Sequence, residues 1–298
     1  MLAKQKCKLL PFIRQNIYGL NYKNQQIVPW SVSKFKVEQE WTKAQGEGVT
    51  VAVIDTGCDL DHPDLVDNLV DGYNFVSRNK SPIDKNGHGT HVAGTIAATN
   101  NKKGIVGVAP KAKIMPLKSL GTDGTGSLRD ICEAILYAAD NGANIITMSL
   151  GTPVSSLKMR QCINYAVDRG CVFFCAAGNS GKESELMYPA KYTDTISIGS
   201  ISNNFTISRF SCSKGSELDF LAPGEDVISC VPDDSYANMT GTSMANPFAA
   251  GCAALLLSYK KKKLTKYDYI EHFSKYSLKP EHIFKTYNSR GIITPILK

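Results

Sequence analysis

The sequence predicts an α/β fold with a mostly parallel central sheet and helices on both of its faces. Short apolar, β-branched runs alternate with helical segments along the 298 residues, as in successive strand–helix units. The chain is long enough for one large domain with a substantial core, and it has no internal repeat and no membrane-spanning apolar run. The predicted strands are Val51 to Asp55, Ile114 to Leu117, Ile145 to Leu150, Val172 to Ala176 and Thr195 to Ser200.

The first of these strands ends in a carboxylate. Val51 to Ile54 is a run typical of a buried parallel strand, and Asp55-Thr56-Gly57 completes it. Open α/β sheets carry their chemistry beyond the carboxyl ends of their strands. Asp55 is therefore a candidate catalytic group, although an aspartate at such a boundary could also cap a helix.

A histidine and a serine begin the two most apolar helical segments. His88 lies between Gly87 and Gly89, and Ser243 follows Gly241-Thr242 before a long apolar run. The free N–H groups and the dipole at a helix N-terminus favour negative charge. His88 could be a buried polar residue and Ser243 a plain turn residue, but an Asp, a His and a Ser at element boundaries are the parts of a nucleophilic triad.

Four motifs together resemble the subtilisin-like serine proteases, and the resemblance covers roughly residues 24 to 257. It implies the fold of that family and a serine endopeptidase activity. The motifs occur in the order Asp, His, Asn, Ser and are Asp55-Thr56-Gly57, His88-Gly89-Thr90-His91, Ala176-Ala177-Gly178-Asn179 and Gly241-Thr242-Ser243-Met244-Ala245.

The resemblance implies a role for each motif residue. Ser243 attacks the scissile carbonyl, His88 takes its proton and later delivers it to the leaving amine, and Asp55 orients the imidazole. Asn179 donates its side-chain amide to the oxyanion, together with the Ser243 backbone N–H. His91 is predicted to be structural, because one triad needs one imidazole.

The competing hypothesis is a catalytically silent subtilisin fold that binds peptides or a partner protein. Since Asp55, His88 and Ser243 are all present, the enzyme is favoured. An esterase is a weaker alternative, because the Gly-x-Ser-x-Gly elbow is absent at Ser243. Asn246 and Phe248 depart from the family, which usually has a small residue and a histidine there.

Two glycine-containing segments are predicted to hold the substrate. An extended peptide can pair its backbone with exposed strand edges, and the resemblance implies that two edges sandwich the residues before the scissile bond. Without the triad, both would pass for plain strand-to-loop transitions. The residues are Gly124, Thr125 and Gly126 on one edge and Ser149, Leu150 and Gly151 on the other.

The resemblance also implies a calcium site. Calcium seeks several oxygens, often backbone carbonyls of one loop plus a carboxylate, and the segment from Thr99 to Ile105 could supply them. The alternative is an ordinary polar loop, whose two lysines would weaken a cation site. The implied ligands are the side chains of Gln26, Asp64 and Asn101 and the backbone oxygens of Thr99, Lys103 and Ile105.

Residues 1–22 are predicted to be an N-terminal extension, and residues 23–298 the catalytic domain with a C-terminal helical tail. Leu9-Leu10-Pro11-Phe12 resembles an element of the intracellular subtilisins that lies across the active-site cleft. We therefore expect a self-inhibited zymogen, with a disordered tail as the alternative.

Composition predicts a cytoplasmic protein. The nine cysteines, an odd number in mostly apolar contexts, indicate reduced thiols, and the N-terminus lacks the continuous apolar core of a signal peptide. Part of the net charge of +7 lies in Lys260 to Lys263, which could attract nucleic acid but more often marks a solvated helix end. We expect protein or peptide substrates and neither nucleic acid nor membrane partners; a homodimer stays open.

Overall fold

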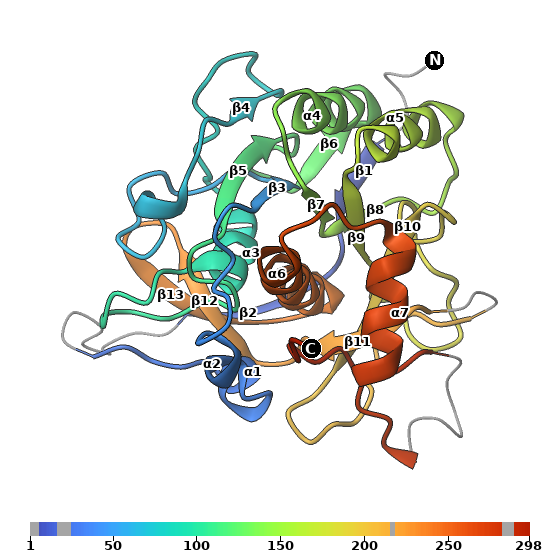
Figure 1. Ribbon diagram of the computed structural model, residues 1–298. Coiled ribbons are helices and arrows are strands. Elements are labelled where there is room, and N and C mark those ends of the chain that lie inside the picture. Colours follow the sequence, from blue (N-terminus) through green and yellow to red (C-terminus); the bar gives the residue numbers. More distant parts are fainter. Residues whose placement is uncertain (1–5, 17–24, 215–217, 282–288) are drawn as a thin grey trace.

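The computed structural model describes residues 6–16, 25–214, 218–281 and 289–298. Its centre is a seven-stranded sheet in which every strand pair is parallel, and helices cover both faces (Figure 1). The predicted fold class is confirmed. In sheet order the strands are β11 (Phe220–Pro223), β10 (Thr195–Ile201), β9 (Val172–Ala176), β7 (Ile145–Met148), β3 (Thr50–Asp55), β5 (Lys113–Lys118) and β4 (Tyr73–Asn74).

Two smaller sheets include the N-terminal strands. One has the order β6-β1-β8 and the other the order β12-β13-β2. Their strands are β1 (Lys6–Leu9), β2 (Ile13–Asn16), β6 (Thr125–Ser127), β8 (Leu150–Gly151), β12 (Val227–Val231) and β13 (Ser235–Thr240). The helices are α1 (Trp30–Lys34), α2 (Val37–Glu40), α3 (His88–Ala97), α4 (Leu128–Asp140), α5 (Leu157–Asp168), α6 (Thr242–Lys260) and α7 (Lys266–Tyr276).

Side-chain alternation along the strands divides the core in two. In β3, Val51 and Val53 pack with α3 and α6, whereas Ala52 and Ile54 pack with α4 and α5. Successive strand residues point to opposite faces of a sheet, and here both faces are buried. This explains why the strand is a continuous apolar run in the sequence.

The predicted strand from Ile145 to Leu150 is two strands in the structure. β7 ends at Met148 within the central sheet, and β8 begins at Leu150 in the sheet that contains β1. Ser149, between them, is buried and donates its hydroxyl to the Ser243 carbonyl. The chain therefore leaves the central sheet directly beside the predicted nucleophile.

Helix α6 runs through the molecule from one end of the central strands to the other. Every residue from Thr242 to Leu256 is buried, which explains the apolar composition of this segment. At about 1.5 Å per residue, its 19 residues separate its ends by about 28 Å. Ser243 lies at the amino end, and the lysine run begins at the carboxyl end.

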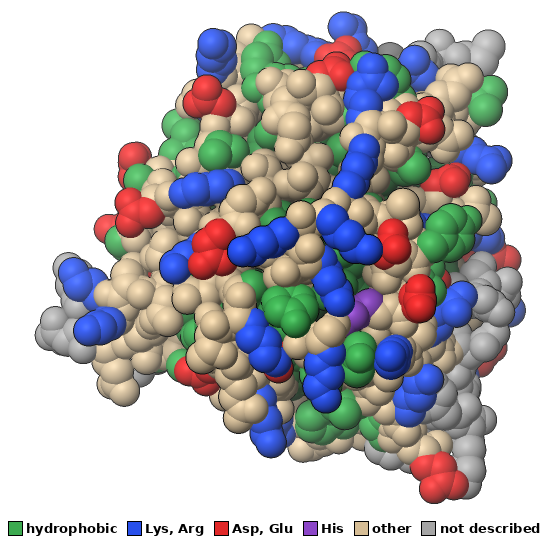
Figure 2. All heavy atoms as spheres, in the orientation of Figure 1, with side chains coloured by type: hydrophobic (Ala, Val, Ile, Leu, Met, Phe, Trp, Pro, Cys, Tyr) green, Lys and Arg blue, Asp and Glu red, His purple; other side chains and the backbone are tan. Residues whose placement is uncertain are grey.

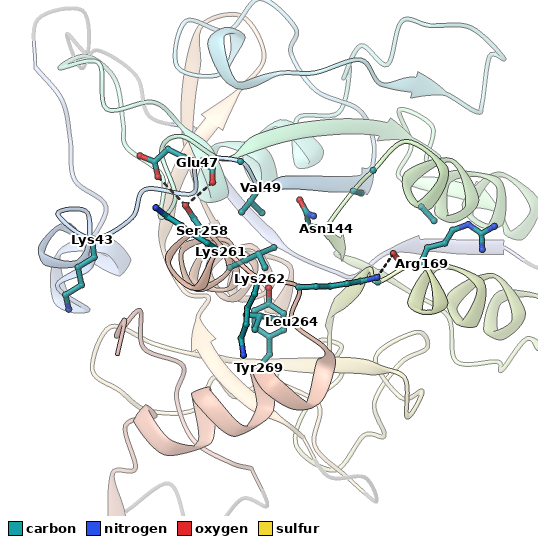
Figure 3. A pocket seen from close by; sticks show the side chains of 17 residues that line it. Lys43, Glu47, Val49, Asn144, Arg169, Ser258, Lys261, Lys262, Leu264 and Tyr269 are labelled. Carbon is teal, nitrogen blue, oxygen red and sulfur yellow. Dashed lines mark hydrogen bonds between the residues drawn. The ribbon is translucent and has the colours of Figure 1, made fainter.

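Lys261 to Lys263 line part of a cavity of about 930 Å³ at the amino ends of β3, β7 and β9 (Figure 3). Many lysine and arginine side chains gather on the face of the molecule that Figure 2 shows. The Lys263 Nζ donates to the Arg169 carbonyl at 3.2 Å, and the Lys260 Nζ donates to the Lys298 carbonyl at 2.7 Å. The lysine run therefore lies at an exposed helix end, and two of its side chains donate to backbone carbonyl groups. The charged residues lining the cavity are Lys43, Glu47, Arg169, Lys261, Lys262 and Lys263.

All nine cysteines are free and buried, as expected for reduced thiols in apolar surroundings. In the described part of the chain, no helix combines the length and the apolar character that crossing a membrane requires.

Candidate active site

Asp55 and His88 form a buried pair at the carboxyl end of β3. The Asp55 Oδ1 lies 2.8 Å from the His88 Nδ1, and the same oxygen accepts the Thr56 N–H at 2.7 Å. Both side chains are almost fully shielded from solvent. Because the carboxylate holds the proton on Nδ1, the other ring nitrogen keeps its lone pair free to accept a proton.

Close packing between α3 and the loop after β3 aligns this pair. His88 is the first residue of α3, and Gly89 follows it. A Cβ at Gly89 would lie 2.2 Å from the Gly57 carbonyl oxygen. The Gly89 N–H also donates to the Thr56 hydroxyl at 2.9 Å. Glycine at this position therefore lets the helix start against the Asp55 loop.

Ser243 lies in the first turn of α6, and its hydroxyl does not reach the histidine. The Ser243 Oγ donates to the Ser149 carbonyl at 3.2 Å, while the His88 Nε2 is buried without a hydrogen-bond partner among the described residues. A resting triad would join these two atoms. Catalytic hydrogen bonds are often incomplete until substrate is bound. The missing hydrogen bond between the Ser243 hydroxyl and the His88 Nε2 is therefore compatible with a triad.

Pro247 contributes to this arrangement one turn into α6. Proline has no N–H, so the Ser243 carbonyl loses the helical partner that residue 247 would otherwise supply. The Ser149 hydroxyl donates to that carbonyl at 2.9 Å. Asn246 supports the same region through its Nδ2, which lies 2.8 Å from the Thr147 Oγ1.

Asn179 follows β9 and presents its amide N–H to the cleft. Its Oδ1 accepts the Thr242 N–H at 2.9 Å and the Thr242 hydroxyl at 2.7 Å. These two donors fix which side of the amide carries the nitrogen. The Nδ2 donates to the Pro11 carbonyl at 2.5 Å, so the predicted oxyanion donor already binds a peptide carbonyl of the same chain.

The N-terminal extension occupies the space between the two predicted substrate edges. β1 pairs antiparallel with β6, where Cys7 is opposite Gly126, and antiparallel with β8, where Leu9 is opposite Leu150. Gly124 has a φ of +74°, and a Cβ there would lie 2.9 Å from a Leu9 methyl carbon. Both predicted edges thus hold an extended peptide, and that peptide is the chain's own.

On either side of Pro11 the extension crosses the predicted catalytic residues. Leu10 is buried, and the Phe12 ring lies 4.9 Å from the His88 ring between centroids. β2 then pairs antiparallel with β13, so that Ile13 is opposite Thr240. Leu9, Leu10, Pro11 and Phe12, the four predicted inhibitory residues, therefore line up across the cleft. The predicted boundary at residues 22 and 23 lies outside the described residues.

His91 lies one helical turn from His88, and its imidazole lies within hydrogen-bond distance of two backbone carbonyl oxygens. Its Nε2 is 2.9 Å from the Val227 carbonyl and 3.1 Å from the Ala237 carbonyl. Burial, followed by the nearby His88, lowers the pKa of His91 to about 3. His91 is therefore neutral and joins α3 to β12 and β13, in keeping with the predicted structural role.

The six predicted calcium ligands meet in one place. The Gln26 Nε2 lies 2.9, 3.1 and 3.2 Å from the carbonyl oxygens of Thr99, Lys103 and Ile105, so three backbone oxygens converge on one amide. The Asn101 Nδ2 donates to the Asp64 carboxylate at 3.0 Å. The donor set fits calcium: turning the Gln26 amide by 180° would add its oxygen to the three carbonyls, where a cation would be needed to hold them together.

A glycine in the same loop allows the carboxylate to approach. Gly104 has a φ of +54°, and a Cβ there would lie 2.0 Å from the Asp64 Oδ2. The side chains of Lys102 and Lys103 are exposed, so the positive charges that counted against a cation site lie at the surface. Whether calcium binds stays a prediction.

The model of the subtilase family matches residues 46–283. The chain belongs to this family. The predicted activity class, a serine endopeptidase, is confirmed with it, and its substrates are proteins or peptides. The individual roles of Asp55, His88, Asn179 and Ser243 stay predictions that the geometry supports.

Several characterised proteins are similar over most of the chain. An intracellular serine protease of Paenibacillus polymyxa is 43% identical over 249 residues, which cover 80% of this chain and 76% of that protein. The major intracellular serine protease of Bacillus subtilis is 37% identical, covering 96% of this chain and 92% of that protein. Thermitase of Thermoactinomyces vulgaris is 43% identical, covering 76% and 80%.

Sequence reasoning missed the supporting roles of three residues. It placed Ser149 only on a substrate edge, it gave Thr242 no function, and it noted Asn246 only as a departure from the family. The structure links Ser149 to Ser243 and Thr242 to Asn179. A polar side chain inside an otherwise apolar helix was the available signal for Asn246.

Proposed function

We propose that this serine endopeptidase is synthesised in a self-inhibited form and uses Asp55, His88 and Ser243 as its triad. One observation carries the proposal: a peptide carbonyl of the chain, that of Pro11, accepts the Asn179 amide N–H beside the Asp55–His88 pair. A bound substrate would offer its scissile carbonyl to the same donor.

In the proposed reaction, the Ser243 hydroxyl rotates from the Ser149 carbonyl towards the His88 Nε2 and gives up its proton as Oγ attacks the substrate carbonyl. The Asn179 amide and the Ser243 N–H stabilise the oxyanion. The Asp55 carboxylate stabilises the imidazolium that forms. His88 then protonates the leaving amine, and water releases the acyl group by the same steps.

Proline at position 11 accounts for inhibition. The β1–β8 register pairs Leu9 with Leu150 and continues towards Ser149. This register places Leu10 opposite Ser149, and Pro11, which has no N–H, cannot extend the pairing beyond it. The Ser149 carbonyl accepts the Ser243 hydroxyl, so the nucleophile is turned away from its base while the extension fills the cleft.

Comparison of the full-length chain with a chain that starts after Lys23 tests the proposal on a short peptide substrate. The truncated protein should be the more active one. Labelling with a fluorophosphonate probe should rise in parallel, because the probe needs the same Ser243 hydroxyl. Equal activity and equal labelling of the two proteins would refute self-inhibition without touching the triad assignment.

Pro11→Ala is a finer test of the same idea. The variant regains an N–H at this position, so we expect the extension to be cut more readily and its new N-terminus to be found by sequencing. An extension as stable as that of the parent chain would contradict the role of the proline.

Calcium binding and an intracellular location complete the proposal. The converging oxygens around Gln26 support the first. The nine buried free thiols support the second, as does the description of two relatives as intracellular serine proteases. Action without nucleic acid or membrane partners, and a homodimer, stay predictions.

A further inference from the structure

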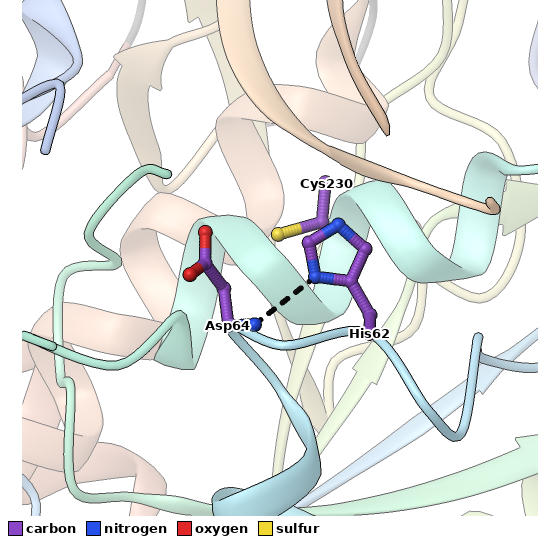
Figure 4. A group of neighbouring side chains, drawn as sticks. All are labelled: His62, Asp64 and Cys230. Carbon is purple, nitrogen blue, oxygen red and sulfur yellow. Dashed lines mark hydrogen bonds between the residues drawn. The ribbon is translucent and has the colours of Figure 1, made fainter. Parts of the chain in front are cut away.

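Three metal-ligating side chains meet in the interior, away from the catalytic residues. His62, Asp64 and Cys230 each offer one ligand atom, and these atoms all lie within 4.8 Å of one another (Figure 4). All three residues are buried. His62 and Asp64 come from the loop after β3, and Cys230 comes from β12.

The histidine is already in the tautomer that a metal requires. The His62 Nε2 lies 3.3 Å from the Ser235 carbonyl, and the Nδ1 accepts the Asp64 N–H at 3.2 Å. The proton therefore resides on Nε2, and the Nδ1 lone pair lies on the side of Asp64 and Cys230 (Figure 4), where a metal ion would take it from the Asp64 N–H. Histidine ligands of metals commonly donate their other ring N–H to a carbonyl in this way.

The glycine at position 94 leaves space for the Cys230 thiol, and the neighbouring side chains hold the site in position. A Cβ at Gly94 of α3 would lie 2.8 Å from the Cys230 Sγ, so glycine is what lets the sulfur lie against the helix. On the other side, the His62 ring packs edge-on against the Tyr236 ring, with centroids 5.4 Å apart. The sulfur and the imidazole thus have rigid neighbours.

The ligand types select the metal. One sulfur, one imidazole nitrogen and one carboxylate oxygen suit zinc, whereas calcium is bound by oxygens alone. Tetrahedral zinc with bonds of about 2.0–2.3 Å needs ligand atoms about 3.3–3.6 Å apart. Starting from 4.8 Å or less, shifts of about 1 Å or less bring the three atoms to that spacing.

We propose that His62, Asp64 and Cys230 bind a zinc ion, with water in the fourth position. On binding, the Cys230 S–H bond breaks and its proton passes to solvent, the Asp64 N–H releases the His62 Nδ1, and sulfur–zinc, nitrogen–zinc and oxygen–zinc bonds form; no oxidation state changes. This site is separate from the catalytic residues and does not depend on the proposed proteolytic mechanism.

The site shares Asp64 with the predicted calcium site, so the two metals compete. The Asp64 carboxylate accepts from Asn101, Ile105 and Tyr236, and zinc would draw one oxygen towards Cys230. The coupling is reciprocal: calcium must weaken zinc binding by the factor by which zinc weakens calcium binding.

Cobalt(II) is the probe, because it takes zinc sites and its thiolate bonds absorb in the near ultraviolet. The full-length chain carrying Ser243→Ala, which prevents autolysis, should develop this band at one cobalt per chain, and zinc should abolish it. Adding Cys230→Ser should remove the band. Cys252→Ser, which changes another buried thiol, is the matched control and should keep it.

Two further measurements guard against a folding defect. His62→Gln should weaken zinc affinity at least tenfold while leaving the stabilisation by calcium alone unchanged. Zinc should reduce the calcium-induced rise in melting temperature of the Ser243→Ala chain, but not that of the Cys230→Ser chain. The proposal is overturned if the parent shows no thiolate band, if the band survives Cys230→Ser, or if His62→Gln binds zinc as tightly as the parent.

Discussion

The two ends of α6 face different parts of the molecule. At the amino end, Ser243 lies beside the carboxyl ends of the parallel strands, where the helix dipole favours negative charge. At the carboxyl end, the lysine run that begins at Lys260 complements the opposite pole of that dipole, and Lys261 to Lys263 border an open cavity. The predicted catalytic residues therefore lie near the amino end of α6, and the lysine run lies at its carboxyl end.

The difference shows that a cavity is not a guide to this active site. The cleft is already filled by β1 and by Leu10, Pro11 and Phe12, so little space is left there. The basic cavity is open but has no arrangement of nucleophile, base and oxyanion donor among its lining residues. The hydrogen bond between Asp55 and His88 identifies the candidate active site at the amino end of α6, whereas the volume of a cavity does not.

The largest expected effect is on proteolysis, and it should distinguish Ser243 from Ser258, a serine near the other end of α6. Ser243→Ala should reduce proteolysis by about 10⁶-fold with the fold intact, because the nucleophile is lost and little volume is removed. Ser258→Ala, whose hydroxyl donates to the Glu47 carbonyl at the basic end, is the matched control and should cleave casein normally. Near-normal cleavage by Ser243→Ala would overturn the assignment.

Asn179→Ala should have the next largest effect. The amide is needed mainly in the transition state, so kcat should fall about 10²–10³-fold with little change in KM. Steady-state kinetics on the truncated chain, where the extension cannot interfere, is the measurement. A raised KM at normal kcat would assign Asn179 to substrate binding instead.

His91 should make the stability of the protein depend on pH. Because burial lowers the pKa of His91 to about 3, only the unfolded chain takes up its proton between about pH 6.5 and 3. Stability is thus fully present above pH 6.5 and falls with decreasing pH, by at most about 1.4 kcal/mol per pH unit.

Denaturant unfolding of the Ser243→Ala chain, with and without His91→Gln, measures this contribution. The His91→Gln chain should be less stable at pH 8 and should lose less stability between pH 6.5 and pH 4. Parallel losses for the two chains would show that His91 does not titrate as inferred.

Calcium bound at the predicted site around Asp64 should stabilise the folded protein without taking part in the proteolytic reaction. A ligand that binds only the native state at 100 times its dissociation constant contributes about 2.7 kcal/mol. Asp64→Ala should remove most of that stabilisation, as seen in melting temperatures with calcium and with chelator. Asp67→Ala, a change of an exposed nearby carboxylate, is the control. No shift on chelation of the parent chain would argue against the site.

The smallest expected effect is at the basic end. Lys262 is exposed, so Lys262→Ala should change stability by less than about 0.5 kcal/mol and leave proteolysis unchanged. Unfolding and casein cleavage measure both. A clear loss of proteolysis in Lys262→Ala would contradict the assignment of catalysis to the amino end of α6 alone.

The sequence by itself predicted the fold class, five of the seven strands of the central sheet and the candidate catalytic residues, but not the short strands β4 and β11 at the two edges of that sheet. Val51 to Asp55 is buried on both faces, so its apolar run and terminal carboxylate were visible without a structure. Asp55, His88, Asn179 and Ser243 each lie within a local motif whose turn or helix start depends on neighbouring glycines.

Only the tertiary structure decided what depends on contacts between distant segments. That Pro11 meets Asn179, 168 positions away, and that Ser243 turns to Ser149 follow from the path of β1 between β6 and β8. The short strands β1 and β2 carry no strong pattern, because they are stabilised by pairing with edges that other parts of the chain provide. The juxtaposition of Cys230 with His62 and Asp64 has the same origin, since packing sets the distance between residues that sequence spacing leaves free.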